Sequence, residues 1–217
     1  MNRRMVLGTA LALPCLPAAL RAQAVPGAID LSRYPVGPLP PDFRSLRTGQ
    51  GAPGEWRVVE DPSASQGKAI AQVSADTTDN RFPLAVYEPL PAQNVEASVR
   101  FKAMAGKVDR AGGLAVRLTD ADNYYVVRAN ALENNVNLYH VVKGSRRQIT
   151  GASVNVSSGE WHTLVLRAEG SRLSVSFDGK PLFTADDRTF PGAGKVALWT
   201  KADSVTRFDR LEIKPLP

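Results

Sequence analysis

Apolar and polar residues alternate along most of this chain with a period of two, and this alternation constrains its fold more than any other feature. Every second residue from Val95 to Ala103 is apolar, and the residues between them are Glu, Ser, Arg and Lys. Successive side chains of a β-strand point to opposite faces, so this pattern is typical of a strand with one face in a core and the other in water. The same alternation covers eight further segments, residues 112–118, 123–130, 135–142, 161–168, 172–177, 181–185, 195–200 and 204–213.

Short turn sequences separate these segments. Asp178-Gly179 lies between two apolar runs and indicates a two-residue hairpin, because both central residues of such a turn adopt positive φ. Gly144-Ser145 and similar Gly/Ser pairs separate other segments, and no part of residues 25–217 has a convincing helical period. The sequence therefore predicts an all-β fold, either an antiparallel sandwich or a barrel.

Residues 1–24 have the features of an export signal. Arg3 and Arg4 form a basic start, residues 5–20 are apolar, and residues 22–24, Ala-Gln-Ala, have the small-x-small form of a signal peptidase site. The Arg pair is compatible with either a Sec or a twin-arginine signal, and the alternative is an ordinary buried N-terminal helix. We expect a periplasmic or secreted protein.

The apolar part of this segment argues against a membrane anchor. It is too short and too interrupted, by Pro14 and Pro17, for a convincing span, so none is expected after the signal is removed. Cys15, the one cysteine of the chain, lies within it, and the Pro that precedes this Cys departs from the usual lipoprotein site. The mature protein would enter an oxidising compartment without a disulfide, so its stability would come from its core.

Charge argues against a nucleic-acid partner. Removing Arg3, Arg4 and Arg21 with the signal lowers the formal net charge from +6 to +3, with 24 basic against 21 acidic residues. Nucleic-acid binding usually needs a concentrated basic patch, and no such motif is present.

Residues 25–54 are rich in Pro and Gly and predict an irregular arm, followed by a single domain over residues 55–217.

A series of motifs in this domain resembles a known superfamily. The motifs are Arg-Ala-Gly-Gly-Leu-Ala-Val-Arg (110–117), Asp-Asn-Tyr-Tyr-Val-Val-Arg (122–128), Trp-His-Thr-Leu (161–164), Phe-Asp-Gly-Lys (177–180), Gly-Lys-Val-Ala-Leu-Trp-Thr-Lys-Ala-Asp (194–203) and Phe-Asp (208–209). Their order is similar to that of concanavalin A-like, laminin-G-like jelly rolls grouped with the bacterial 3-keto-disaccharide hydrolase family. The resemblance implies a two-sheet antiparallel β-sandwich with a concave face that often holds a glycan.

The acidic residues give little support to catalysis. Glycoside hydrolysis usually needs two facing carboxylates, and the Glu-x-Asp-x-x-Glu strand of laminarinase-type relatives is absent. Asp122 and Glu133 are the remaining candidates for an unusual hydrolase or lyase. The two histidines, His140 and His162, are not near a Gly-x-Ser-x-Gly turn.

No cofactor is expected, with one exception that the resemblance suggests. Jelly rolls of this class often hold a structural calcium ion through carbonyl and carboxylate oxygens. Asp120 and Asp209 are the candidates to bind it. The alternative for Asp120 is that it caps a turn.

The polar faces of the strands suggest a binding site. If alternate residues share a face, a set of guanidinium, amide, ammonium and aromatic groups is collected there: Arg100, Arg117, Arg128, Asn130, Asn137, Tyr139, Trp199 and Lys201. Sugars favour this mixture, with an aromatic plate for the ring and planar donors for the hydroxyl groups. Arginines could also select a carboxylated or sulfated glycan. The alternative is a solvated outer face.

Three functions follow, in order of preference. The first is non-catalytic recognition of a glycan or oligosaccharide. The second is a glycoside or 3-keto-disaccharide hydrolase or lyase. The third is a structural or protein-interaction module of the cell envelope. The sequence predicts no particular oligomeric state.

Overall fold

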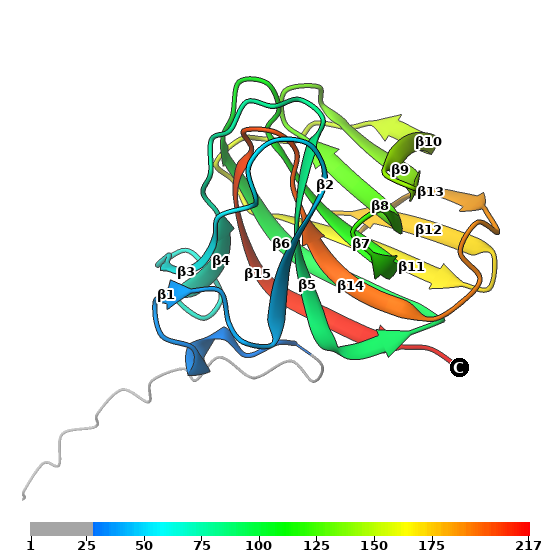
Figure 1. Ribbon diagram of the computed structural model, residues 1–217, viewed down its shortest axis with the longest axis horizontal. Helices are drawn as coiled ribbons and strands as arrows, with labels where there is room; N and C mark the ends of the chain where they lie inside the picture. Colours follow the sequence, from blue (N-terminus) through cyan, green and yellow to red (C-terminus); the bar gives the residue numbers. More distant parts are fainter. Residues whose placement is uncertain (1–27) are drawn as a thin grey trace, which may run out of the picture.

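The alternating segments all form strands in the computed structural model, which describes residues 28–217. Two antiparallel sheets lie face to face (Figure 1). The all-β fold and the two-sheet sandwich are therefore confirmed. The predicted signal, residues 1–24, lies outside the described residues.

Within the described residues, sheet A has eight strands and sheet B has seven. The spatial order of sheet A is β1 (Gly37–Pro38), β3 (Trp56–Glu60), β4 (Lys68–Gln72), β15 (Val205–Pro215), β6 (Val95–Ala105), β11 (His162–Glu169), β12 (Arg172–Phe177) and β13 (Lys180–Asp186). The order of sheet B is β10 (Ser145–Ser153), β9 (Asn135–Val142), β8 (Asn123–Asn130), β7 (Ala111–Asp120), β14 (Gly194–Trp199), β5 (Arg81–Ala92) and β2 (Phe43–Gly49). A short 3-10 helix, η1 (Leu31–Arg33), precedes them, and no helix within residues 28–217 is long and apolar enough to cross a membrane.

The main core lies between the two sheets. Val99 of β6 and Leu166 of β11 face it from sheet A, and Leu114 of β7 and Val127 of β8 face it from sheet B. Each is at most 1% exposed. Burial of such side chains contributes about 1.5–3 kcal/mol each, which explains why the alternation in the sequence sets the two faces of every strand.

The hairpin predicted at Asp178-Gly179 joins β12 to β13. Asp178 has φ 48° and Gly179 has φ 76°, as this type of turn requires. The register confirms the tight connection, because Phe177 pairs with Lys180 directly across the turn.

The expectation of an irregular arm over residues 25–54 is wrong in part. Residues 43–49 form β2, which pairs with β5 from Phe43 opposite Tyr87 to Gly49 opposite Arg81. The Pro-rich sequence before it concealed an edge strand, and β2 lacks the period of two that marks the other segments, because Phe43 and Leu46 are its only apolar residues. This segment is a structural part of sheet B.

Sheet B is strongly curved, as one hydrogen bond between distant strands shows. Three strands separate β2 from β8, which would place them about 19 Å apart in a flat sheet, at about 4.8 Å per strand. Thr48 Oγ1 on β2 nevertheless lies 2.7 Å from the hydroxyl of Tyr124 on β8. The outer face of sheet B is therefore concave, and it encloses a second apolar cluster that includes Phe82, Leu84 and Val126.

Candidate functional site

The concave face of sheet B collects most of the predicted binding residues. Strand pairing sets Trp199 opposite Gly113, Gly113 opposite Arg128, and Arg128 opposite Asn137, so these positions form one row across four strands. Residues opposite one another in an antiparallel pair share a face. Six of the eight predicted residues lie on or beside this face, Arg128, Asn130, Asn137, Tyr139, Trp199 and Lys201.

Arg100 does not belong to this group. It lies on β6, whose alternate residues Val99 and Phe101 point into the main core, so Arg100 points outward from sheet A. Its Nη1 lies 3.1 Å from Asp209 Oδ2, and its guanidinium lies 4.9 Å from the centre of the Trp161 ring. The period of two gave the correct face of the strand, but not the sheet to which the strand belongs.

Arg117 also departs from the predicted group, because β7 contains a bulge. The register shifts after Val116, and Arg117 has φ 50°. Its Nε donates to the carbonyl of Gln93 at 2.7 Å, and its Nη1 donates to the carbonyl of Phe190 at 2.9 Å. A bulge inserts one residue and breaks the alternation of faces, so the sequence pattern fails there. Arg117 is a buried connector between two loops.

Trp199 is on the concave face but is fully buried, so it cannot be the exposed aromatic plate that the sequence suggested. Its ring stacks on Phe82 with a centroid distance of 5.4 Å, and its Nε1 donates to the Tyr124 hydroxyl at 3.2 Å. A Cβ on Gly113 would lie 3.3 Å from this ring and 2.5 Å from the Val127 carbonyl oxygen. The glycine therefore allows the indole to lie against β7.

A buried network of charges lies beside the aromatic cluster. The Asp109 carboxylate lies 3.0 Å from the Lys201 ammonium and accepts a hydrogen bond from Asn130 at 2.9 Å. Arg128 lies 3.8 Å from the same carboxylate and donates to Glu133 at 2.6 Å. The charges of Asp109 and Arg128 are thus compensated within the protein.

The ionisation of these groups follows from burial and from their partners. Burial raises the pKa of the Asp109 carboxyl, and the nearby Arg128 and Lys201 only partly oppose this rise. Burial would also raise the pKa of Glu133, but hydrogen bonds from Asn135 and Arg128 lower it below its usual value. Burial would lower the pKa of Lys201, and its bonds to carboxylates raise it instead.

Asp109 is held in place by a second carboxylate. The loop between β6 and β7 donates backbone N–H groups to Asp203, from Lys107 at 2.6 Å and from Asp109 itself at 2.9 Å. Gly106, at φ 139°, starts this loop, and a Cβ there would overlap the Asp109 carbonyl. This loop therefore presents Asp109 to the concave face in a fixed position.

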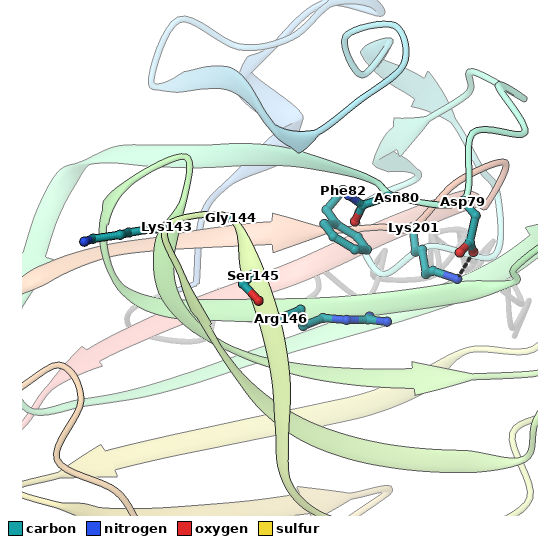
Figure 2. Close-up of a pocket in the computed structure, with 8 residues that line it drawn as sticks. All are labelled: Asp79, Asn80, Phe82, Lys143, Gly144, Ser145, Arg146 and Lys201. Carbon is teal, nitrogen blue, oxygen red and sulfur yellow. Dashed lines mark hydrogen bonds and ion pairs between the residues drawn. The ribbon is translucent and has the colours of Figure 1, made fainter.

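A pocket of about 510 Å³ opens over this face (Figure 2). One side consists of residues at the start of β5 and after β14, namely Asp79, Asn80, Phe82 and Lys201. The other side consists of the β9–β10 hairpin, namely Lys143, Gly144, Ser145 and Arg146. The volume is within the roughly 300–1,000 Å³ of small-molecule sites.

Arg146 is a prominent residue of this pocket that the sequence reasoning missed. Its guanidinium carbon lies 4.5 Å from the ring centre of Tyr139, 4.8 Å from that of Phe82 and 5.7 Å from that of Trp199. Burial lowers its pKa. The alternation of residues 145–149 could have identified it, because Arg146 and Gln148 share a face opposite Arg147 and Ile149.

The two catalytic candidates are far apart. Asp122 lies in the turn before β8, and Glu133 lies in the turn after it, so the eight-residue strand separates them. Glu133 is bonded to Arg128, as described above. The structure does not bring these carboxylates together.

The two calcium candidates are also on different sheets. Asp120 accepts hydrogen bonds from the backbone of Asp122 and the side chain of Asn123, which is the arrangement of a capped turn. Asp209 lies on β15 of sheet A and accepts from the Ser65 backbone at 2.6 Å. Among residues 28–217, no group of three or more His, Cys, Asp or Glu side chains could hold a metal ion.

The two antiparallel sheets and the pocket on the concave face of sheet B define the class of concanavalin A-like jelly rolls. Residues 93–216 match the family described as the C-terminal lectin domain of galactocerebrosidase, and the chain belongs to this family. No curated protein matches the sequence.

Several solved structures share the fold. The carbohydrate-binding module CBM66 from Bacillus subtilis is 20% identical, with a TM-score of 0.60 over 74% of this chain and 91% of that one. A GH16 protein of the Bacteroides ovatus mixed-linkage glucan locus is 11% identical, with a TM-score of 0.59 over 81% of this chain and 96% of that one. A β-glucanase from Bacillus licheniformis is 11% identical, with a TM-score of 0.56 over 89% of this chain and all of that one. At these identities, the similarity establishes the fold alone.

Proposed function

We propose that this protein is a non-catalytic carbohydrate-binding domain that acts in the periplasm or after secretion. The observation that carries the proposal is the pocket over the concave face of sheet B, with Asn80, Ser145 and Arg146 on its walls. Amide, hydroxyl and guanidinium groups are suitable donors and acceptors for sugar hydroxyls. Membership of a lectin-domain family and the shared fold with CBM66 support the same function.

The carboxylates near the pocket favour binding over hydrolysis. Among the described residues that line it, Asp79 alone is acidic, and it is bonded to Lys201. A glycosidase needs one carboxylic acid and a second, facing carboxylate. Asp109 lies below the pocket, is 1% exposed and is paired with Lys201. This arrangement provides no second carboxylate in contact with a bound sugar.

Export depends on residues 1–24, which the sequence predicts to be a cleaved signal. The intact mass of the protein purified from the native host is expected to correspond to a chain that begins at Val25. A mass that includes Met1 would contradict the export part of the proposal and leave the binding part unaffected.

A pair of matched variants tests the binding part. Ser145 and Ser153 are exposed residues at the two ends of β10, and only Ser145 lines the pocket. Ser145→Trp is expected to reduce retention on a glycan array by about tenfold or more, because the indole occupies space that a sugar needs. Ser153→Trp is expected to leave retention unchanged. No retention of any glycan by the wild-type protein, or release of sugar from a bound glycan, would contradict the proposed function.

A further inference from the structure

The pocket contains a cation whose charge is not compensated by the protein. Nη1 of Arg146 is buried and has no hydrogen-bond partner, and no ion pair of Arg146 is found within residues 28–217. Guanidinium remains charged in proteins and offers five N–H donors. A buried charge without a partner is unfavourable, so this side chain has unused capacity to bind an anion.

Arg128 provides a direct comparison on the same face. Both guanidinium groups lie near the ring of Tyr139, at 5.7 Å for Arg128 and 4.5 Å for Arg146. Arg128 is 2% exposed and is bonded to Glu133 and Asn135. Arg146 has aromatic neighbours where Arg128 has oxygen acceptors. Aromatic faces hold a cation in position but do not occupy its N–H donors.

Three of the four charged residues that line the pocket are cations. Lys143, Arg146 and Lys201 are cations, and Asp79 is the one acid among the described lining residues. Figure 2 shows the side chains of Arg146 and Lys201 extending toward the Asp79 side of the pocket, whereas Lys143 extends away from the other labelled side chains. Lys201 is paired with Asp79 and Asp109, so Arg146 is the group on which an incoming anion would be centred.

We infer that the pocket recognises an acidic sugar and that Arg146 binds its carboxylate or sulfate group. This inference rests on the proposed carbohydrate-binding function and specifies the class of glycan. The planar guanidinium matches two oxygens of a carboxylate or a sulfate, and such charge-assisted bonds are about twice as strong as neutral ones. A neutral sugar would leave the charge of Arg146 uncompensated.

The experiment compares oligosaccharides on an array that carries galacto-, gluco- and manno-configured chains in neutral, uronic acid and sulfated forms. At least one uronic acid or sulfated chain is expected to bind about tenfold or more tightly than its neutral counterpart. This preference is expected to weaken as the salt concentration rises, because ions screen charged contacts. The uronic acid and sulfated arms distinguish a carboxylate from a sulfate.

Neighbouring arginines of β10 provide matched variants. Arg146→Gln is expected to abolish the preference for the acidic chain, and Arg146→Lys to restore part of it, because an ammonium keeps the charge but loses the planar fork. Arg147→Gln removes the same charge from an exposed residue that does not line the pocket, and it is expected to keep the preference. Thermal unfolding of each variant controls for misfolding.

The outcomes separate this inference from the proposed function. Equal binding of neutral and acidic chains by the wild-type protein would overturn the acidic specificity and leave carbohydrate binding intact. An equal loss of preference in Arg146→Gln and Arg147→Gln would overturn the role of Arg146. Binding of no chain at all would overturn both proposals.

Discussion

The ammonium of Lys201 lies 3.0 Å from the carboxylate of Asp109, and the two groups are 12% and 1% exposed. The same ammonium pairs with Asp79, which is 74% exposed. Lys201 therefore connects the solvent side of the pocket to a buried charge below it. Both carboxylates pair with Lys201, but Asp109 is buried and Asp79 is exposed. Their removal should therefore change the free energy of unfolding by different amounts.

Asp109→Ala is expected to destabilise the protein by about 3–5 kcal/mol. It leaves Lys201 and Arg128 without a buried counter-charge, and breaking one partner of a buried pair carries a cost of this size. Asp79→Asn is expected to change the free energy of unfolding by less than about 1 kcal/mol, because exposed ion pairs contribute little. Urea denaturation of both variants measures the difference, and similar effects would contradict the role assigned to burial.

Trp199 shows where the sequence was informative about the site and where it was not. Alternation placed Trp199, Arg128 and Asn137 on one face, and the structure agrees. The burial of Trp199 was not predictable from the sequence, because it depends on the curvature of sheet B, which brings Thr48 against Tyr124. That curvature is set by long-range pairing, and a local pattern of residues does not contain it.

Trp199→Ala is therefore expected to act on stability. Removing a buried aromatic side chain costs about 3–5 kcal/mol through lost contacts and a cavity. Trp161→Ala is the control, because Trp161 is half-buried against Arg100 and Lys102 outside the main core and should cost less. Thermal unfolding monitors both. A Trp199→Ala protein as stable as the wild type would show that the indole is not part of the packed cluster.

The positions of Arg100 and Arg117 show a second limit of what the sequence pattern can predict. For Arg100, the alternation was correct, but it does not say which sheet a strand joins. For Arg117, the register shift in β7 changed the face, and no turn residue marked the bulge. Within residues 95–213, local alternation predicted every strand except β10. Strand order and bulges were not predictable, because they depend on the partner strand.

The bulge at Arg117 requires a glycine on the adjoining strand. A Cβ on Gly194 would lie 2.3 Å from the carbonyl carbon of Arg117, which is part of the backbone and cannot move aside. Gly194→Ala is expected to destabilise the protein by about 2 kcal/mol or more, as overpacking does. Gly192→Ala adds the same methyl group two residues earlier, where nothing lies within 4 Å, and should be nearly neutral. Equal melting temperatures for the two variants would contradict a close approach of β14 to the bulge.

The lowered pKa of Asp61 predicts how the stability of the protein depends on pH. Burial alone would raise its pKa, but hydrogen bonds from Lys102, Ser63 and Arg207 hold the pKa well below its usual value. A carboxyl with a lowered pKa in the folded state contributes stability above the pKa of the unfolded chain, near 4, and loses this contribution as the pH falls further. Asp61→Asn should therefore lower the free energy of unfolding at pH 7 and flatten its decline below about pH 4.

The measurement is urea denaturation from pH 7 to pH 2, and Glu160→Gln is the control. Glu160 is exposed and makes no ion pair in the part of the chain that the structure describes, so its replacement should leave the whole curve unchanged. If Asp61→Asn and the wild type lose stability in parallel below pH 4, the acid sensitivity arises from other carboxylates. If they converge as the pH falls, the contacts of Asp61 with Lys102 and Arg207 account for the difference, because protonation removes from the wild type the charge that the variant lacks.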